Sequence, residues 1–261
     1  IMNEERPEPV ICFGQQPNGF FPKRLLFAKI ETARKLQSAI GGKIVFFYHD
    51  SDADYRETIT LLTDINTGEE VRINFTHDNR IQKKYSPLYV KKISASWKGE
   101  TKRRLPRFLA KSNIDIFENA TGDTAADFCL DMYIRLGIFE GIEIVRSSDK
   151  NFRMTASDLA EFFADVNYEG EIVRAEMHQG NLRLHEGGGK YFDVASPEVI
   201  EKWQKSAGRD YRFAWMQSVI HCTHYISGIG ENEYLKKENF PEVAFITREE
   251  IERSDHAYIP K

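Results

Sequence analysis

Residues 10–48 read VICFGQQPNGFFPKRLLFAKIETARKLQSAIGGKIVFFY, and this stretch decides the fold. Its apolar run at 10–13 predicts a short buried strand. Apolar residues then recur at three- and four-residue spacing over 23–40, which is typical of a helix. A glycine pair ends the helix, and 43–48 is almost continuously apolar, like a strand of a parallel sheet that is covered on both faces. The stretch therefore predicts a right-handed β-α-β unit.

Two excursions interrupt this pattern further along the chain. The first covers about 59–111, where an Asn-Thr-Gly sequence between 59–64 and 70–75 predicts a β-hairpin. The remainder of this excursion, 80–111, is basic and weakly patterned, with room for one or two helices. The second excursion, 167–195, is polar and broken by glycines, which predicts a small β-meander.

Between and after the excursions the core pattern returns. Residue spacing predicts helices at 124–136, 159–166, 198–205 and 213–225, and strands at 142–145 and 243–246. This order predicts a single α/β domain over residues 1–261. We expect a Rossmann-like parallel-sheet core, a basic inserted segment and a small β-meander.

Composition narrows the class of protein. Of the 261 residues, 41% are hydrophobic, which is enough for a sizeable core, and the formal net charge of −4 gives no overall case for nucleic-acid binding. No apolar run approaches the roughly 20 residues that a membrane-spanning helix needs, and residues 1–10 are acidic and polar. Cys12, Cys129 and Cys222 lie far apart without C-x-x-C spacing, which favours a reducing compartment. We therefore expect a cytoplasmic globular protein that does not contact a membrane.

The turn after the first strand is the first candidate site. Ligands of open α/β sheets bind beyond the carboxyl ends of the strands, where a helix N-terminus offers free N–H groups. Glycines let a ligand approach the backbone, amide side chains donate and accept hydrogen bonds, and a lysine can meet a phosphate or a carboxylate. An ordinary glycine turn is the alternative. The predicted substrate-binding residues of this turn are Gly14, Gln15, Gln16, Asn18, Gly19 and Lys23.

Carboxylates follow the second strand, at the same edge of the predicted sheet. Asp50, Asp52 and Asp54 lie within five residues, and crowding of carboxylates raises the pKa of at least one, which suits acid–base chemistry. We predict Asp52 and Asp54 as catalytic residues that hold an amino group or act as a base. A helix N-cap with solvated charges is the alternative.

A third candidate follows the apolar stretch 213–225. Gly228 and Gly230 beside Glu231 can form a backbone nest for an anion, although turn formation explains them about as well. In the same stretch His221 and His224 are three residues apart and flank a cysteine, but packing explains these residues better than a metal site or a nucleophile does. We predict no metal site.

The order of these features resembles the Rossmann-like core of the cysteine-adding enzymes of bacillithiol synthesis, ligases that join cysteine to glucosaminyl-malate. The turn at 12–16 is similar to that family's G-Q-Q turn, and 51–55 to its E-D-H-D-F segment, with Ala53 at the histidine position. Residues 144–149 resemble its strand with a Ser-Gly-Asp-like turn. Residues 215–234 resemble its apolar helix and G-P-G-E-I-x-Y turn.

This resemblance implies an enzyme that binds a small polar anionic metabolite and joins it to an amine or amino acid. It adds Ser147, Asp149 and Tyr234 to the predicted substrate-binding residues. Residues 14–19 also resemble, more weakly, the opening strand and helix of class I aminoacyl-tRNA synthetases and related nucleotidyltransferases. The sequence identifies no cofactor, and ATP or ADP is the candidate that these resemblances allow. The expected enzyme class is a C–N-bond-forming ligase or a nucleotidyltransferase-like enzyme.

A non-catalytic module is the alternative function. The basic stretch 83–107 includes Tyr89, Trp97 and the run Lys102-Arg103-Arg104, a composition found on RNA-contacting surfaces. On this interpretation the chain is a degenerate nucleotide-binding-like α/β module that binds RNA or a protein partner. A solvated basic face explains the stretch more simply.

Overall fold

A computed structural model describes residues 8–260, so most of the acidic stretch predicted at 1–10 lies outside the described residues. Its centre is a five-stranded sheet in the order β12-β11-β1-β2-β5, with every pair of neighbours parallel. The sheet confirms the predicted Rossmann-like α/β core. Its strands are β1 (Val10–Gln15), β2 (Lys43–Tyr48), β5 (Ile142–Arg146), β11 (His224–Ser227) and β12 (Ala244–Thr247).

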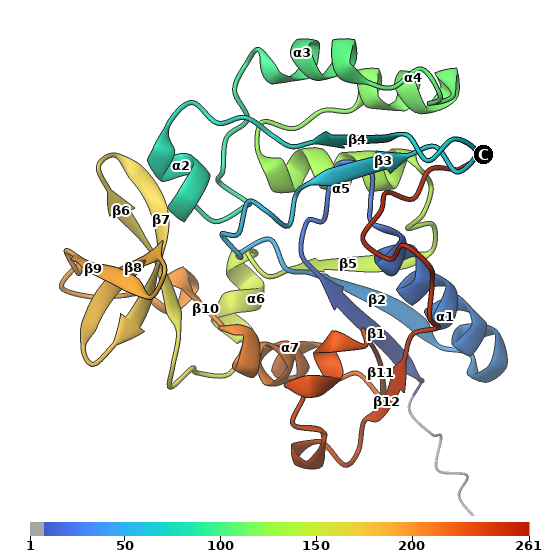
Figure 1. The fold of residues 1–261 in the computed structure, drawn as a ribbon. Helices are drawn as coiled ribbons and strands as arrows, with labels where there is room; N and C mark the ends of the chain where they lie inside the picture. The colour runs from blue at the N-terminus through green and yellow to red at the C-terminus, as the bar shows by residue number, and fades with distance from the viewer. Residues whose placement is uncertain (1–7, 261) are drawn as a thin grey trace, which may run out of the picture.

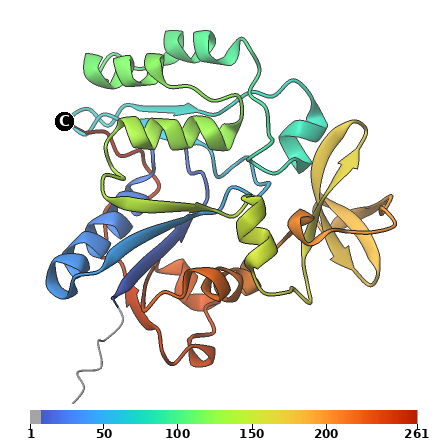
Figure 2. The ribbon, with the colours of Figure 1, turned by 180° about the vertical axis from the view of Figure 1, so that it is seen from behind.

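Helices cover both faces of this sheet, as the apolar run of β2 predicts (Figures 1 and 2). On one face Phe13 and Phe46 pack under α1 (Arg24–Ile40) and α5 (Ala125–Arg135). On the other face the alternate strand residues, among them Cys12 and Phe47, pack against α6 (Lys150–Thr155) and α7 (Arg212–Ile220). Because successive side chains of a strand point to opposite faces, a continuous apolar run supplies both cores.

The inserted segment forms a layer beyond α5. Its hairpin is β3 (Thr60–Thr63) and β4 (Glu70–Ile73), close to the predicted bounds. Its helices are α2 (Arg80–Tyr85) and α3 (Trp97–Arg104), followed by α4 (Lys111–Asn119). An aromatic cluster of Phe20, Phe75, Trp97, Phe117 and Phe128 holds the layer to the core. The turn after β1 therefore contributes a core side chain, Phe20, to this layer.

The meander is a five-stranded antiparallel sheet in the order β10-β6-β7-β8-β9, which projects from the side of the core (Figure 1). The helix predicted at 159–166 is wrong because β6 begins within it. Apolar residues at 159, 162, 163 and 166 imitate helical spacing, but the backbone reverses at Glu169 and Gly170, both at positive φ, as a type I′ hairpin requires. The strands are β6 (Phe163–Tyr168), β7 (Glu171–His178), β8 (Asn181–Gly187), β9 (Lys190–Val194) and β10 (Lys205–Ser206).

Two further helix predictions need correction. Over 198–205 the chain forms only the 3-10 turn Lys202–Gln204. The predicted helix at 213–225 ends at Ile220, because His221 adopts a left-handed conformation, and residues 224–227 form β11 instead. A left-handed residue commonly ends a helix, and here the apolar sequence continues through the break. The prediction therefore missed a strand of the central sheet.

The C-terminal segment covers the start of α1. The backbone N–H groups of Arg24 and Leu25 donate to the carbonyls of His256 and Ser254, both at 2.8 Å, and Tyr258 stacks on Phe27. These N–H groups are the ones that the turn was expected to offer to an anion, and the chain itself satisfies them. Within residues 8–260, no helix has the length and apolar character needed to cross a membrane.

Candidate functional site

A pocket of about 210 Å³ lies beyond the carboxyl ends of β1, β2 and β11. The strand order reverses between β1 and β11, and such switch points are where open α/β sheets bind ligands. We call this cavity the switch-point pocket. Seven predicted site residues line it: Gly14, Gln15, Gln16, Gly228, Gly230, Glu231 and Tyr234.

The glycine nest after β11 is filled by the side chain of Glu231. One oxygen of this carboxylate accepts a hydrogen bond from the Gly228 N–H and lies 2.5 Å from Lys29 Nζ, and the other lies 3.2 Å from the Tyr225 hydroxyl. Lys29 is buried and also donates to the Gly14 carbonyl at 2.7 Å. The ion pair thus joins α1, β1 and the turn after β11. The Glu231 carboxylate therefore lies at the turn where the sequence predicted an anion site, and the Gly228 N–H contacts it.

Two arginines supply the unpaired donors of the switch-point pocket. Arg212 Nη2 lies 3.1 Å from Asp52 Oδ2, and Arg248 Nη1 donates to the Glu249 carbonyl at 2.8 Å. The Nε atoms of both arginines are buried and have no hydrogen-bond partner among residues 8–260. With Lys29, the lining carries three cationic side chains and one carboxylate, Glu231. Lys29 pairs with Glu231 and Arg212 with Asp52, so Arg248 is the cation of this lining that has no carboxylate partner among residues 8–260, and its charge favours an anionic ligand.

His49 also lines the switch-point pocket. Its side chain is buried, and burial, followed by the charges of Arg212, Arg174 and Lys29, lowers its pKa well below the usual value. The imidazole is therefore neutral at pH 7. Neither ring nitrogen has a hydrogen-bond partner among residues 8–260. A neutral imidazole in this position can accept one hydrogen bond and donate another to a bound molecule.

The two predicted catalytic carboxylates lie in different surroundings. Asp52 accepts hydrogen bonds from Gln16 and Arg212, and although burial raises its pKa, the charges of Arg174 and Arg212 outweigh burial and hold the pKa well below the usual value. Asp52 is therefore ionised at neutral pH and is a weak base. Asp54 is outside the switch-point pocket and pairs with Arg56 at 2.7 Å.

The other predicted residues of the first turn have structural partners. The Tyr133 hydroxyl donates to Asn18 Oδ1 at 2.9 Å, and Asn18 is buried beneath the layer of the inserted segment. Gly19 has φ +105°, and a Cβ atom there would lie 2.8 Å from the Phe21 carbonyl oxygen, so the position requires glycine for backbone reasons. Lys23 pairs with Glu57 at 3.6 Å. These three residues do not line the switch-point pocket.

Ser147 and Asp149 are also outside the switch-point pocket. Ser147 is buried and shares a 2.7 Å hydrogen bond with Ser51, while Asp149 caps α6 by accepting from the Phe152 N–H at 2.8 Å. His224 lies in β11, where its Nδ1 is 2.8 Å from the Thr223 hydroxyl. In the part of the chain that the structure describes, no group of three or more His, Cys, Asp or Glu side chains is arranged to hold a metal ion.

Sequence reasoning missed three polar residues of the lining, which are Lys29, Arg212 and Arg248, and it gave no role to His49, the first residue of the candidate segment after β2. Lys29 carried a signal, because it lies on the apolar stripe of α1 between Leu26 and Ile30 and must be buried with them. Arg248 directly follows the carboxyl end of the last strand, which is a second usable signal. No signal in the sequence indicated Arg212, because its position depends on how α7 packs against the sheet.

A buried lysine supports the loop that carries Asp52. Lys91 Nζ donates to the carbonyls of Ala53 at 2.7 Å and Lys83 at 2.8 Å, and burial lowers its pKa from 10.5 to about 7. The unfolded chain therefore binds more protons than the folded one between about pH 7 and pH 10.5, so stability rises with pH across this window. Below the pKa of about 7 that Lys91 has in the folded protein, the side chain is charged in both states. The free-energy cost of burying that charge then lowers stability by its full amount.

We expect the stability of the natural protein, relative to Lys91→Met, to increase between about pH 7 and pH 10 by roughly 1 kcal/mol per pH unit. Urea denaturation of both proteins at several pH values measures this difference. Lys92→Met, at the exposed neighbouring position, is the matched control and should show no such slope. A pH-independent difference between the natural protein and Lys91→Met would contradict the prediction.

Fold and site together define a Rossmann-like α/β protein with a cation-rich pocket at its switch point. No protein-family model matches the chain, and no curated protein matches it significantly.

Proposed function

We propose that this chain binds a small polar anionic metabolite in the switch-point pocket. The observation that carries the proposal is the pair of arginines, Arg212 and Arg248, whose buried Nε atoms have no hydrogen-bond partner within residues 8–260. A buried donor without a partner costs about 1–3 kcal/mol, and a carboxylate or phosphate can offset that cost through charge-assisted hydrogen bonds. The Gln15 and Gln16 amides on the opposite wall suit the hydroxyl groups of the same ligand.

We further propose that the bound metabolite is joined to an amine or amino acid, with ATP as the candidate source of activation. The resemblance to the cysteine-adding enzymes motivates this part. Neutral His49 suits the incoming amine, because an unprotonated imidazole can accept a hydrogen bond from it. Asp52, ionised and held by Gln16 and Arg212, would orient Arg212 and would not act as the base.

RNA binding by the inserted segment receives less support. Three of its lysines are engaged within the fold: Lys91 is buried, Lys98 donates to the carbonyls of Glu118 and Ala120, and Lys102 pairs with Glu118. These three lysines are therefore less available to contact RNA. We retain the small-molecule proposal.

Calorimetric titration of the purified chain with ATP, ADP, cysteine and glucosaminyl-malate tests the proposal. We expect at least one anionic compound to bind, and Arg248→Gln to weaken that binding about 10- to 100-fold, which corresponds to losing one hydrogen bond to a charged group. Arg103→Gln is the matched control, because Arg103 is exposed on α3 and outside the lining. If none of the four compounds binds, or if both variants bind like the natural protein, the proposal fails.

A further inference from the structure

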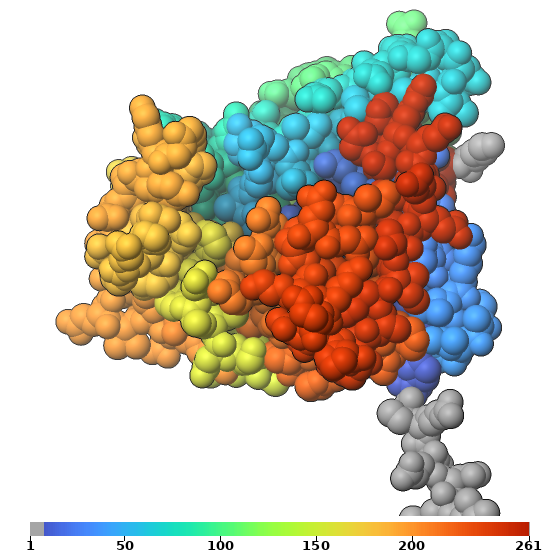
Figure 3. All heavy atoms as spheres, turned by 60° about the horizontal axis from the view of Figure 1, so that its bottom comes forward, coloured from blue at the N-terminus to red at the C-terminus, as the bar shows by residue number. Residues whose placement is uncertain are grey.

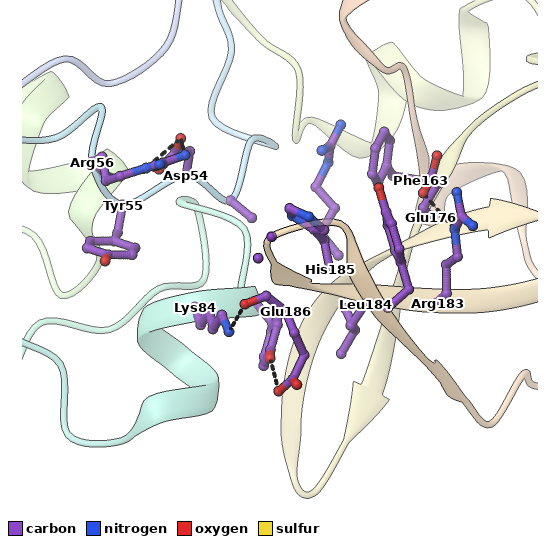
Figure 4. A pocket seen from close by; sticks show the side chains of 16 residues that line it. Asp54, Tyr55, Arg56, Lys84, Phe163, Glu176, Arg183, Leu184, His185 and Glu186 are labelled. Carbon is purple, nitrogen blue, oxygen red and sulfur yellow. Dashed lines mark hydrogen bonds and ion pairs between the residues drawn. The ribbon is translucent and has the colours of Figure 1, made fainter.

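A second cavity, about 590 Å³ in volume, lies between the core and the meander. One wall is the loop after β2, residues 53–56, with the end of α2, and the other includes the face of the antiparallel sheet that carries Phe163, Glu176 and Arg183 (Figure 4). Arg174 lies on the same face of that sheet. Figure 3 shows the surface hollowed between the yellow-orange meander and the light-blue residues that follow β2. We call this cavity the inter-sheet cleft. Its volume falls within the range of small-molecule sites, whereas the switch-point pocket is smaller.

Most charged side chains of the inter-sheet cleft already have partners. Arg56 pairs with Asp54 at 2.7 Å, and Arg183 pairs with Glu176 at 2.9 Å. Figure 4 shows both pairs at the walls. The Glu186 carboxylate, likewise on the wall, is 3.1 Å from Arg80. These pairs neutralise one another and leave little charge for a ligand.

Two cations are exceptions: Lys84, whose ammonium donates only to the backbone carbonyl of Glu186 among residues 8–260, and Arg174. The guanidinium of Arg174 lies 3.7 Å from the centroid of the Phe163 ring and donates to the Ser206 hydroxyl at 3.3 Å and the Ala207 carbonyl at 2.9 Å. It forms no ion pair with any carboxylate among residues 8–260, and Nη1 has no hydrogen-bond partner there. Burial lowers its pKa to about 10, and the group is still protonated at neutral pH. A planar guanidinium held against a ring and by two hydrogen bonds is preorganised to bind a carboxylate or phosphate.

Asp52 stands between the two cavities. Its chain neighbours Ala53 and Asp54 line the inter-sheet cleft, while the partners of its carboxylate, Gln16 and Arg212, line the switch-point pocket. The Asp52 carboxylate contacts Arg212 directly, and the charges of Arg174 and Arg212 both lower its pKa. Ligands in the two cavities would therefore lie on either side of Asp52.

We infer that the inter-sheet cleft is a second ligand site, which takes a small molecule with a phosphate or carboxylate group bound to the guanidinium of Arg174. This site is distinct from the switch-point pocket and gives the protein places for two reactants. The anion satisfies the free donor of Arg174, and the volume accommodates a ligand of nucleotide size.

Nuclear magnetic resonance of the ¹⁵N-labelled chain, titrated separately with pyrophosphate, ATP and succinate, tests this inference. Gly187 and Gly188 line the inter-sheet cleft, and Gly228 and Gly230 line the switch-point pocket, so their amide signals report on each cavity separately. We expect saturable shifts at Gly187 and Gly188 with at least one probe. Response to pyrophosphate or ATP alone identifies a phosphate ligand, and response to succinate alone identifies a carboxylate.

Arg174→Gln should weaken this binding at least tenfold, since it removes the charge but keeps a hydrogen-bond donor. Arg56→Glu, at the exposed rim, should weaken it several-fold without disturbing the interior, and Arg103→Glu on α3 is its matched control. Absence of saturable shifts at Gly187 and Gly188 with all three probes would overturn the inference. Equal affinity in the natural protein and the cleft variants would also overturn it.

Arg248→Gln separates this inference from the proposed function. It should reduce any response at Gly228 and Gly230 and leave the response at Gly187 and Gly188 unchanged. A response confined to Gly187 and Gly188 would mean that the switch-point proposal fails while the second site stands. A response confined to Gly228 and Gly230 would mean that the second site is absent while the switch-point proposal stands.

Discussion

Replacing Asp50 by asparagine should lower the free energy of unfolding by about 3–5 kcal/mol, the usual cost of breaking a buried ion pair from one side. The Asp50 carboxylate is fully buried and accepts from Arg146 Nε at 2.6 Å, from the Ser147 hydroxyl at 3.0 Å, and from both the N–H and the hydroxyl of Ser148 at 2.9 and 2.6 Å. These contacts tie the carboxyl end of β2 to that of β5. An amide offers one acceptor oxygen and no charge, so several donors lose their partner.

Chemical denaturation of the natural protein and Asp50→Asn measures the effect. Asp54→Asn is the matched control, because the same chemical change falls on a carboxylate that is partly exposed and paired with exposed Arg56. Asp54→Asn should lower the free energy of unfolding by no more than about 1 kcal/mol, as is usual for surface ion pairs. Similar midpoints for the two variants would show that the Asp50 network contributes little to stability.

Arg153→Met should destabilise the protein by a similar amount, about 3–5 kcal/mol, because it leaves Asp165 charged and buried. The two side chains are 1% and 2% exposed, and Arg153 Nη1 lies 2.6 Å from Asp165 Oδ2. Arg153 also donates to the carbonyls of Ser147 and Trp203, both at 2.9 Å. The pair therefore joins α6 of the core to β6 of the meander.

The double variant Arg153→Met/Asp165→Leu tests this explanation. Removing both charges should recover a large part of the lost stability, since no unpaired buried charge remains. Stability can be followed by urea denaturation of the natural protein, Arg153→Met and the double variant. If the double variant is less stable than Arg153→Met by the full cost of a second buried substitution, the ion-pair explanation is wrong.

The local sequence correctly predicted the helices and strands in which apolar residues recur with an unambiguous period. Strands β1 and β2 with helix α1 follow from a continuous apolar run, a helical spacing and a glycine stop, and all three lie close to their predicted bounds. The hairpin of β3 and β4 follows from its turn residues. Prediction failed at 159–166 and 224–227, where apolar spacing fits a helix and a strand equally well. At 224–227 pairing with the distant strand β1 decided the outcome, and at 159–166 pairing of β6 with the next strand of its hairpin, β7, did so.

Some features of the candidate site could likewise be predicted from the sequence, and others could not. The sequence by itself determined the β-α-β unit and the position of Gly14–Gln16 at a strand end, because the relevant interactions are local in the chain. Only the tertiary structure decided that Glu231 fills its own glycine nest, that His256 and Ser254 cap α1, and that Arg212 reaches Asp52 from 160 residues away. Such pairings depend on how elements pack across the sheet. Residue spacing along the chain does not reveal that packing. The cationic side chains that line the two cavities could therefore be identified only from the folded structure.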